Sequence, residues 1–454
     1  MSVEPRFTLA TALADIDRIY AKQQERRASI AATTAPERKE KIRRLHDAVL
    51  SRRDVIRVAL WRDYEKPAPE VDLSEILPVV GEARHAMRHL RSWMKPRRVA
   101  APLTVLGSRS RIVQQAKGVV LIISPWNFPI NLTFGPLVSA IAAGNCVILK
   151  PSEMTPNASA CMKQIVSDLF DESEVAVIEG DAKVAEALLK KKFDHIFFTG
   201  SPAVGKIVMR AAAEHLTSVT LELGGKSPAI VDRTANLDEA ATKIAWGKTL
   251  NSGQVCIAPD YILVDETVRG PFVEKLRAAA VGGSGLLVND RHAARIQRLA
   301  ENSDVQGRRV PLKILEDVSP EAPVMKEEIF GPLLPVIPYR DLSEALEIIN
   351  RREHPLVLYL FSRERSVIDR VLQQTRAGGS VINDTLIHFY QLNLPFGGVG
   401  ESGIGKAHGR FGFEAFSNAR GVLEQPTRFS GIQFLYPPYT RLKQKLIDFI
   451  VRYL

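Results

Sequence analysis

The chemistry of this chain is expected around one cysteine, Cys256, which lies in the segment 251–260 between a glycine turn and a Pro-Asp corner. A short turn of this kind can present a thiol instead of burying it. Upstream, Glu222 ends an apolar run in the segment 221–226. A thiol and a carboxylate that each follow regular structure suggest a nucleophile and its general base. A lone cysteine is more often a small buried hydrophobe, so the surrounding pattern has to decide.

The elements before Glu222 read as alternating strands and helices. This βαβ alternation predicts a parallel sheet with helices on both faces, and ligands of such sheets bind at the C-terminal ends of the strands. The predicted strands are 119–123, 146–149, 174–178, 195–198 and 218–221, and the predicted helices are 134–143, 158–170, 182–189 and 203–215.

A second α/β segment follows and contains Cys256. Its predicted strands are 229–231, 261–264, 333–337, 357–361 and 380–382, and its predicted helices are 236–250, 289–301, 341–350 and 365–376. Outside these two units, residues 8–95 have a helical pattern, 97–117 suggest a hairpin or arm, and 394–405 are rich in glycine. The chain closes with an amphipathic basic helix.

A glycine-containing loop, Gly200-Ser-Pro-Ala-Val-Gly205-Lys206, follows a predicted strand and precedes a predicted helix. This context is typical of an anion cradle at a helix N-terminus. The loop nearly matches the phosphate loop of nucleotide triphosphatases, but Ile207 stands where Mg²⁺ ligation needs Ser or Thr. The similar segment 400–406 is followed by Ala407. A nucleotide triphosphatase is therefore disfavoured, whereas anion binding at 200–205 is expected.

Composition is that of a soluble globular protein, since 45% of the 454 residues are hydrophobic and 25% are charged. Three cysteines, Cys146, Cys161 and Cys256, are too few for a disulfide framework and fit a reducing compartment. Neither a signal peptide nor a membrane-spanning run is indicated, so a cytoplasmic location is expected. The net charge of +10 permits weak attraction to anions. Lys and Arg are spread along the chain, so we predict no nucleic-acid recognition, and we predict no metal site.

Taken together, the motifs resemble the aldehyde dehydrogenase superfamily from about residue 40 to residue 425, most closely its class 3 members. One such motif would be weak evidence, but their shared order makes chance implausible. They are Ser124-Pro-Trp-Asn-Phe-Pro129, Lys150-Pro-Ser-Glu153, Phe198-Thr-Gly-Ser-Pro-Ala-Val-Gly205, Leu221-Glu-Leu-Gly-Gly-Lys226, the cysteine segment 251–260, Glu327-Glu-Ile-Phe-Gly-Pro332 and Leu394-Pro-Phe-Gly-Gly-Val-Gly400.

The resemblance implies that Cys256 attacks an aldehyde and that Glu222 activates the water that hydrolyses the resulting thioester. Asn127 would donate a hydrogen bond to the oxyanion, and the site would have to lower the thiol pKa or supply a base. NAD or NADP would be the cofactor. The residues implied to bind it are Pro125, Trp126, Lys150, Glu153, Gly200, Ser201, Val204, Gly205, Leu223, Gly224, Glu328 and Phe330.

Each site residue also has a purely structural interpretation. Asn127 could form a turn, Lys150 and Glu153 could be a solvated ion pair, Glu222 could cap the next element, and Glu328 could lie on an acidic surface. Taken one at a time, most of these residues favour the structural interpretation. Taken together as motifs in a fixed order, they favour the functional one. Glu153 favours NAD by repelling a 2′-phosphate, although a mobile carboxylate accommodates NADP as well.

The resemblance implies an α/β fold with a Rossmann-like cofactor domain (1–96 and 118–222) and a second α/β catalytic domain (223–393). Oligomerisation segments would be 97–117 and 394–430, and 431–454 would be an amphipathic tail. A homodimer is expected, with medium- or long-chain aliphatic or aromatic aldehydes as substrates. The alternatives are a CoA-acylating enzyme, against which Glu222 argues, and a peripheral contact of the tail with the inner membrane face.

Overall fold

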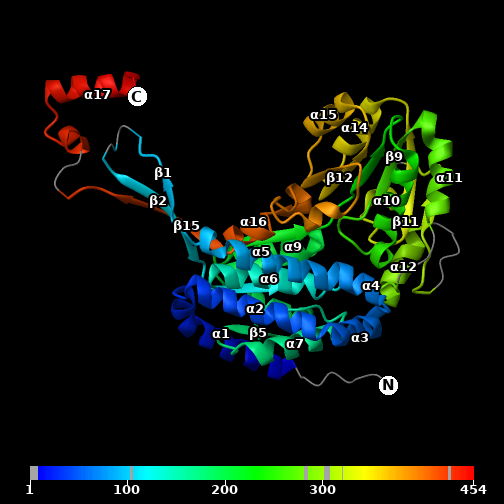
Figure 1. Cartoon of the computed structure of the whole chain (residues 1–454), viewed down its shortest axis with the longest axis horizontal. Helices are drawn as coiled ribbons and strands as arrows, with labels where there is room; N and C mark the ends of the chain where they lie inside the picture. Colours follow the sequence, from blue (N-terminus) through cyan, green and yellow to red (C-terminus); the bar gives the residue numbers. More distant parts are fainter. Residues whose placement is uncertain are drawn as a thin grey trace.

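The computed structural model describes residues 9–102, 105, 107–280, 285–300, 307–319, 321–427 and 431–453, and predictions on the remaining residues lie outside it. The chain forms two α/β bodies beside each other and a narrow arm that projects from one of them (Figure 1). This arrangement confirms the predicted α/β class with two parallel sheets and an arm. The division of the chain into domains stays a prediction.

Residues 9–93 fold into consecutive helices, as the sequence pattern predicts. Helix α2 begins with a capping box, in which the backbone N–H of Thr34 donates to Oε2 of Glu37 over 2.7 Å. A π-helical turn lies between the fourth and the fifth helix. The helices are α1 (Leu9–Ala31), α2 (Ala35–Ser51), α3 (Arg53–Tyr64), α4 (Ala68–Val71), the π-helical turn η1 (Asp72–Ile76) and α5 (Leu77–Trp93).

The first sheet has the strand order β5-β4-β3-β6-β7-β14, in which all neighbours are parallel except the pair β14–β7. The order reverses between β3 and β6, and such a switch point is where ligands bind. Its strands are β3 (Val119–Ile123), β4 (Cys146–Lys150), β5 (Val175–Val177), β6 (His195–Gly200), β7 (Ser218–Leu223) and β14 (Gly403–Ile404). Its helices are α6 (Asn131–Ala143), α7 (Pro156–Leu169), α8 (Ala182–Leu189) and α9 (Pro202–Ala213).

Both faces of this sheet are apolar, because successive side chains of a strand point to opposite sides. In β3, Val120 and Ile122 pack with helices α2, α5, α6 and α7, whereas Val119, Leu121 and Ile123 pack with α1, α8 and α9. This double burial explains why the strands have continuous apolar runs that the sequence reveals.

The second sheet is parallel throughout, with the order β10-β11-β9-β8-β12-β13. Of its strands and helices, β10, α11 and α13 are not predicted from the sequence. The strands are β8 (Pro228–Val231), β9 (Tyr261–Asp265), β10 (Lys313–Leu315), β11 (Leu333–Tyr339), β12 (Val357–Phe361) and β13 (Gly379–Ile382). The helices are α10 (Leu237–Thr249), α11 (Arg269–Ala279), α12 (Asp290–Leu299), α13 (Pro323–Lys326), α14 (Leu342–Asn350) and α15 (Arg365–Gln374), with short turns η3 (Leu250–Gly253) and η4 (Glu266–Val268).

The arm is a three-stranded antiparallel sheet with β2 in the centre. Its strands β1 (Arg97–Val99) and β2 (Arg109–Ala116) confirm the predicted hairpin, and β15 (Ser417–Glu424) joins it from the other end of the chain. Between the second sheet and β15 lie the turns η5 (Ile387–Tyr390) and η6 (Gly400–Ser402) and the helix α16 (Gly409–Ala415). The oligomerisation role of these segments stays a prediction.

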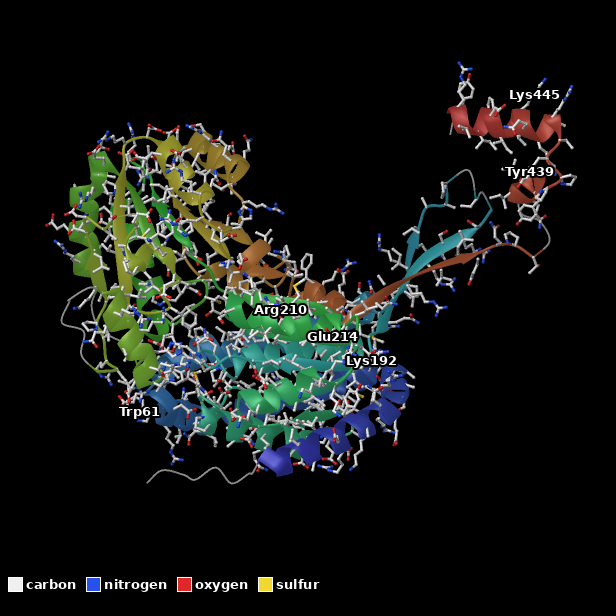
Figure 2. All side chains as sticks on the ribbon, turned by 180° about the vertical axis from the view of Figure 1, so that it is seen from behind. Trp61, Lys192, Arg210, Glu214, Tyr439 and Lys445 are labelled. Carbon is white, nitrogen blue, oxygen red and sulfur yellow. The ribbon has the colours of Figure 1, made fainter. Side chains whose placement is uncertain are left out.

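The C-terminal segment contains the turn η7 (Gly431–Leu435) and the helix α17 (Arg441–Tyr453), which confirms the predicted amphipathic helix. Figure 2 shows Tyr439 and Lys445 beyond the tip of the arm, away from Arg210 and Glu214 of the body. No described side chain of α17 is buried. Within a single chain, the protein's own surface therefore does not cover this helix. None of the helices in the described ranges is long and apolar enough to cross a membrane.

Candidate active site

Two cavities meet where the two α/β bodies face each other, and Cys256 and Glu222 line both of them. The larger, of about 560 Å³, is the charged cavity, whose lining includes Lys226, Arg295 and Glu328. The smaller, of about 360 Å³, is the apolar cavity, whose lining is rich in Phe and Leu. Both volumes lie in the range of small-molecule sites. A thiol and a carboxylate that border both cavities can act on a molecule held between them.

The backbone before Cys256 turns through three residues of positive φ, which are Asn251 (49°), Ser252 (55°) and Gly253 (72°). A Cβ atom at Gly253 would lie 2.4 Å from the carbonyl oxygen of Gly331, so this turn requires glycine there. The backbone of Asn251 is held by a further hydrogen bond, which its N–H donates to Oε2 of Glu70 over 2.9 Å. The turn places the Cys256 thiol, which is partly buried, at the junction of the cavities.

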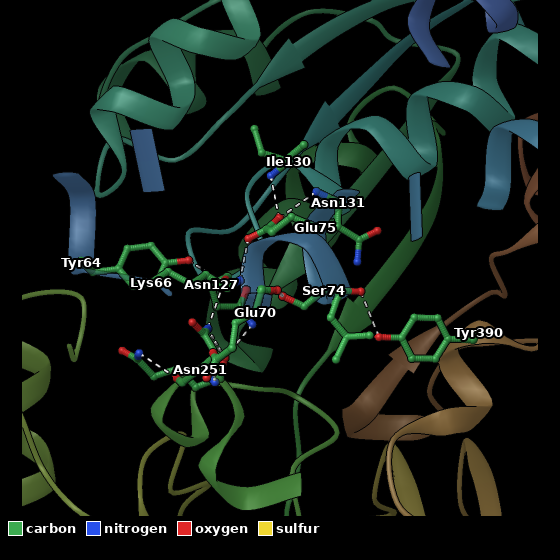
Figure 3. Close-up of polar contacts among 12 residues, drawn as sticks. Tyr64, Lys66, Glu70, Ser74, Glu75, Asn127, Ile130, Asn131, Asn251 and Tyr390 are labelled. Atoms are coloured by element: carbon green, nitrogen blue, oxygen red, sulfur yellow. Dashed lines mark hydrogen bonds and ion pairs between the residues drawn. The ribbon is translucent and has the colours of Figure 1, made fainter. Parts of the chain in front are cut away.

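Asn127 follows β3 and is joined to the cysteine loop by its side chain and its backbone (Figure 3). Its amide donates a hydrogen bond of 3.0 Å to the carbonyl of Gln254, and its carbonyl accepts one of 2.9 Å from the amide of Asn251. The Tyr64 hydroxyl donates to the same carbonyl over 3.0 Å. One hydrogen of the Asn127 amide is thus engaged, and the second remains for a ligand in the charged cavity that Asn127 lines.

Glu222 lies in β7 between Thr199 of β6 and Gly403 of β14, which are its register partners. Neither carboxyl oxygen has a hydrogen-bond partner among the described residues. Burial raises the pKa of Glu222 to about 8, and the nearby charge of Lys406 only partly offsets this rise. A carboxyl with a pKa near neutrality and two free oxygens is suited to take up and release a proton.

The described surroundings of Cys256 raise the pKa of its thiol. Burial raises its pKa to about 12, and the carboxyl groups of Glu328 and Glu222 add to this rise. Of the two routes expected from the sequence, the described surroundings therefore do not supply a lowered thiol pKa. The remaining route is a base that removes the proton as the sulfur reacts, and Glu222 borders the same cavities.

Glu328 extends into the charged cavity beside Gly224. A Cβ atom at Gly224 would lie 2.1 Å from Oε2 of Glu328, so glycine is required for the two to approach. Burial and the neighbouring charge of Asp260 raise the pKa of Glu328 to about 8. Trp126 and Phe330 contact each other edge to face, with ring centroids 5.3 Å apart, and Pro125 lies beside them in the lining. An aromatic wall and a carboxyl group can thus bind a polar ring system.

The N-terminus of α9 opens into the charged cavity through Gly200 and Ser201. The Ser201 hydroxyl caps the helix by accepting from the backbone N–H of Val204 over 3.4 Å. Gly205 lies against Leu223, because a Cβ atom there would be 2.8 Å from the Leu223 side chain. These positions suit an anion at the helix end.

Not every predicted site residue borders the charged cavity. Val204 and Gly205 are not part of its lining, and Leu223 lines the apolar cavity instead. Lys150 and Glu153 form an ion pair of 3.0 Å at the end of β4, outside the lining of either cavity. The cavities also have lining residues that sequence reasoning missed, including Glu82, His408 and Leu132. These three stand outside the quoted motifs, so no sequence signal pointed to them.

The family is shown by comparison with known proteins. The profile of the aldehyde dehydrogenase family matches residues 6–422. The 4,4'-diaponeurosporen-aldehyde dehydrogenase of Staphylococcus aureus is 40% identical over 423 residues, which cover 88% of this chain and 92% of that protein. Human aldehyde dehydrogenase family 3 member B1 is 42% identical over 410 residues, with 86% and 88% covered.

Solved structures agree with these relatives. A substrate-bound AldH of Staphylococcus aureus superposes with a TM-score of 0.91 at 38% identity, covering 96% of this chain and 99% of that one. PnpE in complex with nicotinamide adenine dinucleotide has a TM-score of 0.84 at 26% identity, with 92% and 91% covered. The fold and the site define a two-sheet α/β oxidoreductase. This chain belongs to the aldehyde dehydrogenase family and acts on aldehydes, and the class 3 resemblance and the nicotinamide cofactor, NAD or NADP, are confirmed.

Proposed function

We propose that this protein oxidises medium- or long-chain aliphatic aldehydes, or aromatic aldehydes, to carboxylic acids through a covalent intermediate on Cys256. The observation that carries the proposal is that Cys256 and Glu222 line both the apolar and the charged cavity. The apolar cavity is suited to the hydrocarbon part of the aldehyde, because burying apolar surface stabilises the complex by roughly 25 cal/mol per Å².

The first step forms a bond between the sulfur of Cys256 and the carbonyl carbon. The thiol proton passes to the carboxylate of Glu222, since a thiol with a pKa of about 12 is protonated at neutral pH. The carbonyl oxygen becomes an oxyanion, to which the second hydrogen of the Asn127 amide and the backbone N–H of Cys256 donate. Loss of one such donor typically lowers the rate by ~10²–10³.

The charged cavity fits a nicotinamide dinucleotide in the chemistry of its lining. The capped N-terminus of α9, at Gly200 and Ser201, suits the pyrophosphate, and Glu328 suits a ribose hydroxyl beside Phe330. Lys150 and Glu153 lie at the neighbouring strand end, where they would meet the adenine ribose. The bound cofactor supplies the acceptor of the hydride that leaves the thiohemiacetal, and a thioester on Cys256 remains.

Hydrolysis of the thioester completes the reaction. Once Glu222 has released the thiol proton to solvent, its carboxylate takes a proton from water and the hydroxide adds to the thioester carbon. The C–S bond then breaks, and the proton held by Glu222 passes to the departing sulfur. Both Glu222 oxygens are unpartnered among the described residues, so one can accept the proton directly. In a CoA-acylating enzyme a thiol would replace water at this step, and a water-activating carboxylate would be needed less. Glu222 therefore favours release of the free acid.

The assembly proposed for the protein is a homodimer in the cytoplasm. Strands β1 and β15 form the two edges of the arm sheet, and an exposed edge is usually covered by a partner. All three cysteines are free, which suits a reducing compartment. Peripheral attachment of the basic helix α17 to the inner membrane face is the competing use of the uncovered tail.

Absorbance of the reduced cofactor tests the chemistry. Cys256→Ala should abolish aldehyde-dependent reduction of the cofactor. Cys146→Ala and Cys161→Ala should retain it, because both residues are buried and neither lines either cavity. Glu222→Gln should retard hydrolysis, so that a burst of reduced cofactor precedes slow turnover. Turnover by Cys256→Ala, or product formation that requires CoA, would refute the proposed reaction.

A further inference from the structure

A buried carboxyl group interrupts the apolar cavity. Glu82 of α5 is 5% exposed and lines this cavity together with Cys256. The surrounding lining is otherwise dominated by apolar side chains, among them Phe197, Phe389 and Phe396. Burying a carboxyl group in such surroundings costs free energy unless hydrogen-bond or ionic partners compensate. The presence of Glu82 therefore needs an explanation.

Glu82 uses only one of its two oxygens within the protein. Oε1 accepts a hydrogen bond of 2.7 Å from the backbone N–H of Gly409, whereas Oε2 has no hydrogen-bond partner in the described ranges. The closest cationic candidate is Nδ1 of His408, at 4.0 Å from Oε2, and this nitrogen also lacks a hydrogen-bond partner there. Two unpartnered polar atoms thus face each other across a gap at the cavity wall.

The His408 ring is held in place by its aromatic neighbours. Its centroid lies 4.5 Å from that of Phe389, edge to face, and 4.9 Å from that of Phe396. Its backbone has a φ of 71°, a conformation that non-glycine residues rarely adopt and that concentrates at functional sites. The imidazole therefore keeps its orientation toward Glu82 instead of rotating to close the gap.

Electrostatics argue against a simple ion pair between the two groups. Burial lowers the pKa of His408 to about 3, so its imidazole is neutral at physiological pH. Burial raises the pKa of Glu82 to about 7. A neutral imidazole and a carboxyl that is only partly ionised leave room for a neutral polar group between them.

We propose that Glu82 and His408 form a subsite for a hydroxyl group at the end of the aldehyde remote from its carbonyl. A hydroxyl oxygen about 2.8 Å from each atom can bridge a 4.0 Å gap, and it can both donate and accept. A carboxylate on the substrate would be repelled by Glu82, and an ammonium group would be desolvated by the apolar wall. Hydroxylated aromatic aldehydes fit best, because their rings match the phenylalanines. This subsite rests on the proposed function, since it selects among aldehydes that reach Cys256.

Paired substrates test the subsite in a way that misfolding cannot imitate. The pairs are cinnamaldehyde with 4-hydroxycinnamaldehyde, and hexanal with 6-hydroxyhexanal. In the unaltered enzyme, kcat/KM should be about tenfold higher for at least the aromatic hydroxylated member. Glu82→Leu should reduce this ratio to near one, and Glu82→Gln, which keeps polar atoms of similar shape, should retain most of it. Partial unfolding lowers both rates together and leaves the ratio unchanged.

Binding without turnover separates this inference from the proposed reaction. In the full-length Cys256→Ala protein, calorimetry should show that 4-hydroxycinnamaldehyde binds about tenfold more tightly than cinnamaldehyde, and Glu82→Leu should remove the difference. Equal binding of the two aldehydes, or a preference that survives Glu82→Leu, overturns the subsite and leaves Glu82 as a cap for Gly409 alone. Absence of turnover with intact discrimination in binding would instead refute the chemistry and support the subsite.

Discussion

Gly397 lies directly against the carboxyl group of Glu222, since a Cβ atom at Gly397 would be 3.0 Å from Oε1. The same Cβ atom would be 2.7 Å from the carbonyl oxygen of Gly405. The φ of Gly397 is +144°, which side chains rarely tolerate. The glycine-rich segment therefore serves to let the backbone pass beneath the proposed base.

Gly397→Ala should displace the Glu222 carboxyl group and slow thioester hydrolysis. A displacement of about 1 Å in a catalytic group can cost ~10²-fold in rate. The matched control is Gly421→Ala in β15, where a Cβ atom would meet nothing within 4 Å. Steady-state turnover and the size of the cofactor burst would be measured for both variants. Equal turnover by the Gly397 and Gly421 variants would contradict the role assigned to this contact.

The rate of hydrolysis should depend on the ionisation of Glu222. Its pKa of about 8 means that the carboxylate, the form that accepts a proton, becomes scarce below pH 8. Turnover limited by hydrolysis should therefore fall about tenfold per pH unit below 8 and level off above it. A pH profile between 6 and about 9.5 checks this expectation. Glu222→Gln should flatten it, and a profile unchanged in this variant would exclude Glu222 as the titrating group.

The stability of the folded protein should fall as pH rises, whereas the hydrolysis rate should increase. The pKa values of Glu222 and Glu328 rise from an ordinary 4.5 to about 8 in the folded protein, so the folded state holds protons that the unfolded chain releases. Their contribution to stability is complete below pH 4.5 and is lost as pH rises through 8. The melting temperature of cofactor-free protein should fall over this window, and less so for the double variant Glu222→Gln, Glu328→Gln. A steeper fall in that variant would contradict the assignment.

Sequence patterns predicted strands that are buried on both faces and helices with one clear apolar face. Strands β3 and β12 and helix α8 have the predicted bounds, because continuous apolar runs or a clear helical face mark them. Strand β15 escaped prediction because most of its side chains are exposed and its pairing partner β2 is distant in the sequence. Its structure depends on that pairing and not on a local apolar pattern.

The site residues likewise fall into those that local sequence motifs identify and those that only the fold brings together. Cys256, Glu222 and Asn127 belong to compact motifs, so a resemblance could identify them. Glu82 and His408 come from α5 and from the residue before α16, and only the fold brings them to one cavity. Their burial, and the pKa shifts that follow from it, depend on neighbours from many elements and cannot be read from sequence.

A buried ion pair behind Asn127 should be important for stability. Lys66 and Glu75 are both fully buried and 2.7 Å apart, and Oε2 of Glu75 accepts hydrogen bonds from the backbone N–H groups of Ile130 and Asn131 (Figure 3). Lys66→Met should destabilise the protein by about 3–5 kcal/mol, because it leaves a buried carboxylate without its cation. Denaturant titration measures this change.

The surface pair Arg43–Glu40 provides the control for the buried pair, since both of its side chains are more than half exposed. Arg43→Ala should cost no more than about 1 kcal/mol. The double variant Lys66→Met, Glu75→Gln should be less destabilised than Lys66→Met alone, because no charge is then left uncompensated. Equal losses for Arg43→Ala and Lys66→Met would show that the buried pair contributes nothing special.

The exposed apolar face of α17 should be covered by a second copy of the chain. Leu442, Phe449 and Tyr453 are 77%, 58% and 62% exposed, and the helix lies beyond the tip of an arm whose two edge strands are free for pairing in a dimer (Figure 1). Deleting residues 438–454 should weaken the dimer while leaving oxidation of short aldehydes intact, and sedimentation at micromolar concentration measures the change. Liposome flotation with anionic lipid separates the competing interpretation. A full-length chain that sediments as a monomer and floats with the liposomes, and a truncated chain that does not float, would assign α17 to a membrane surface instead.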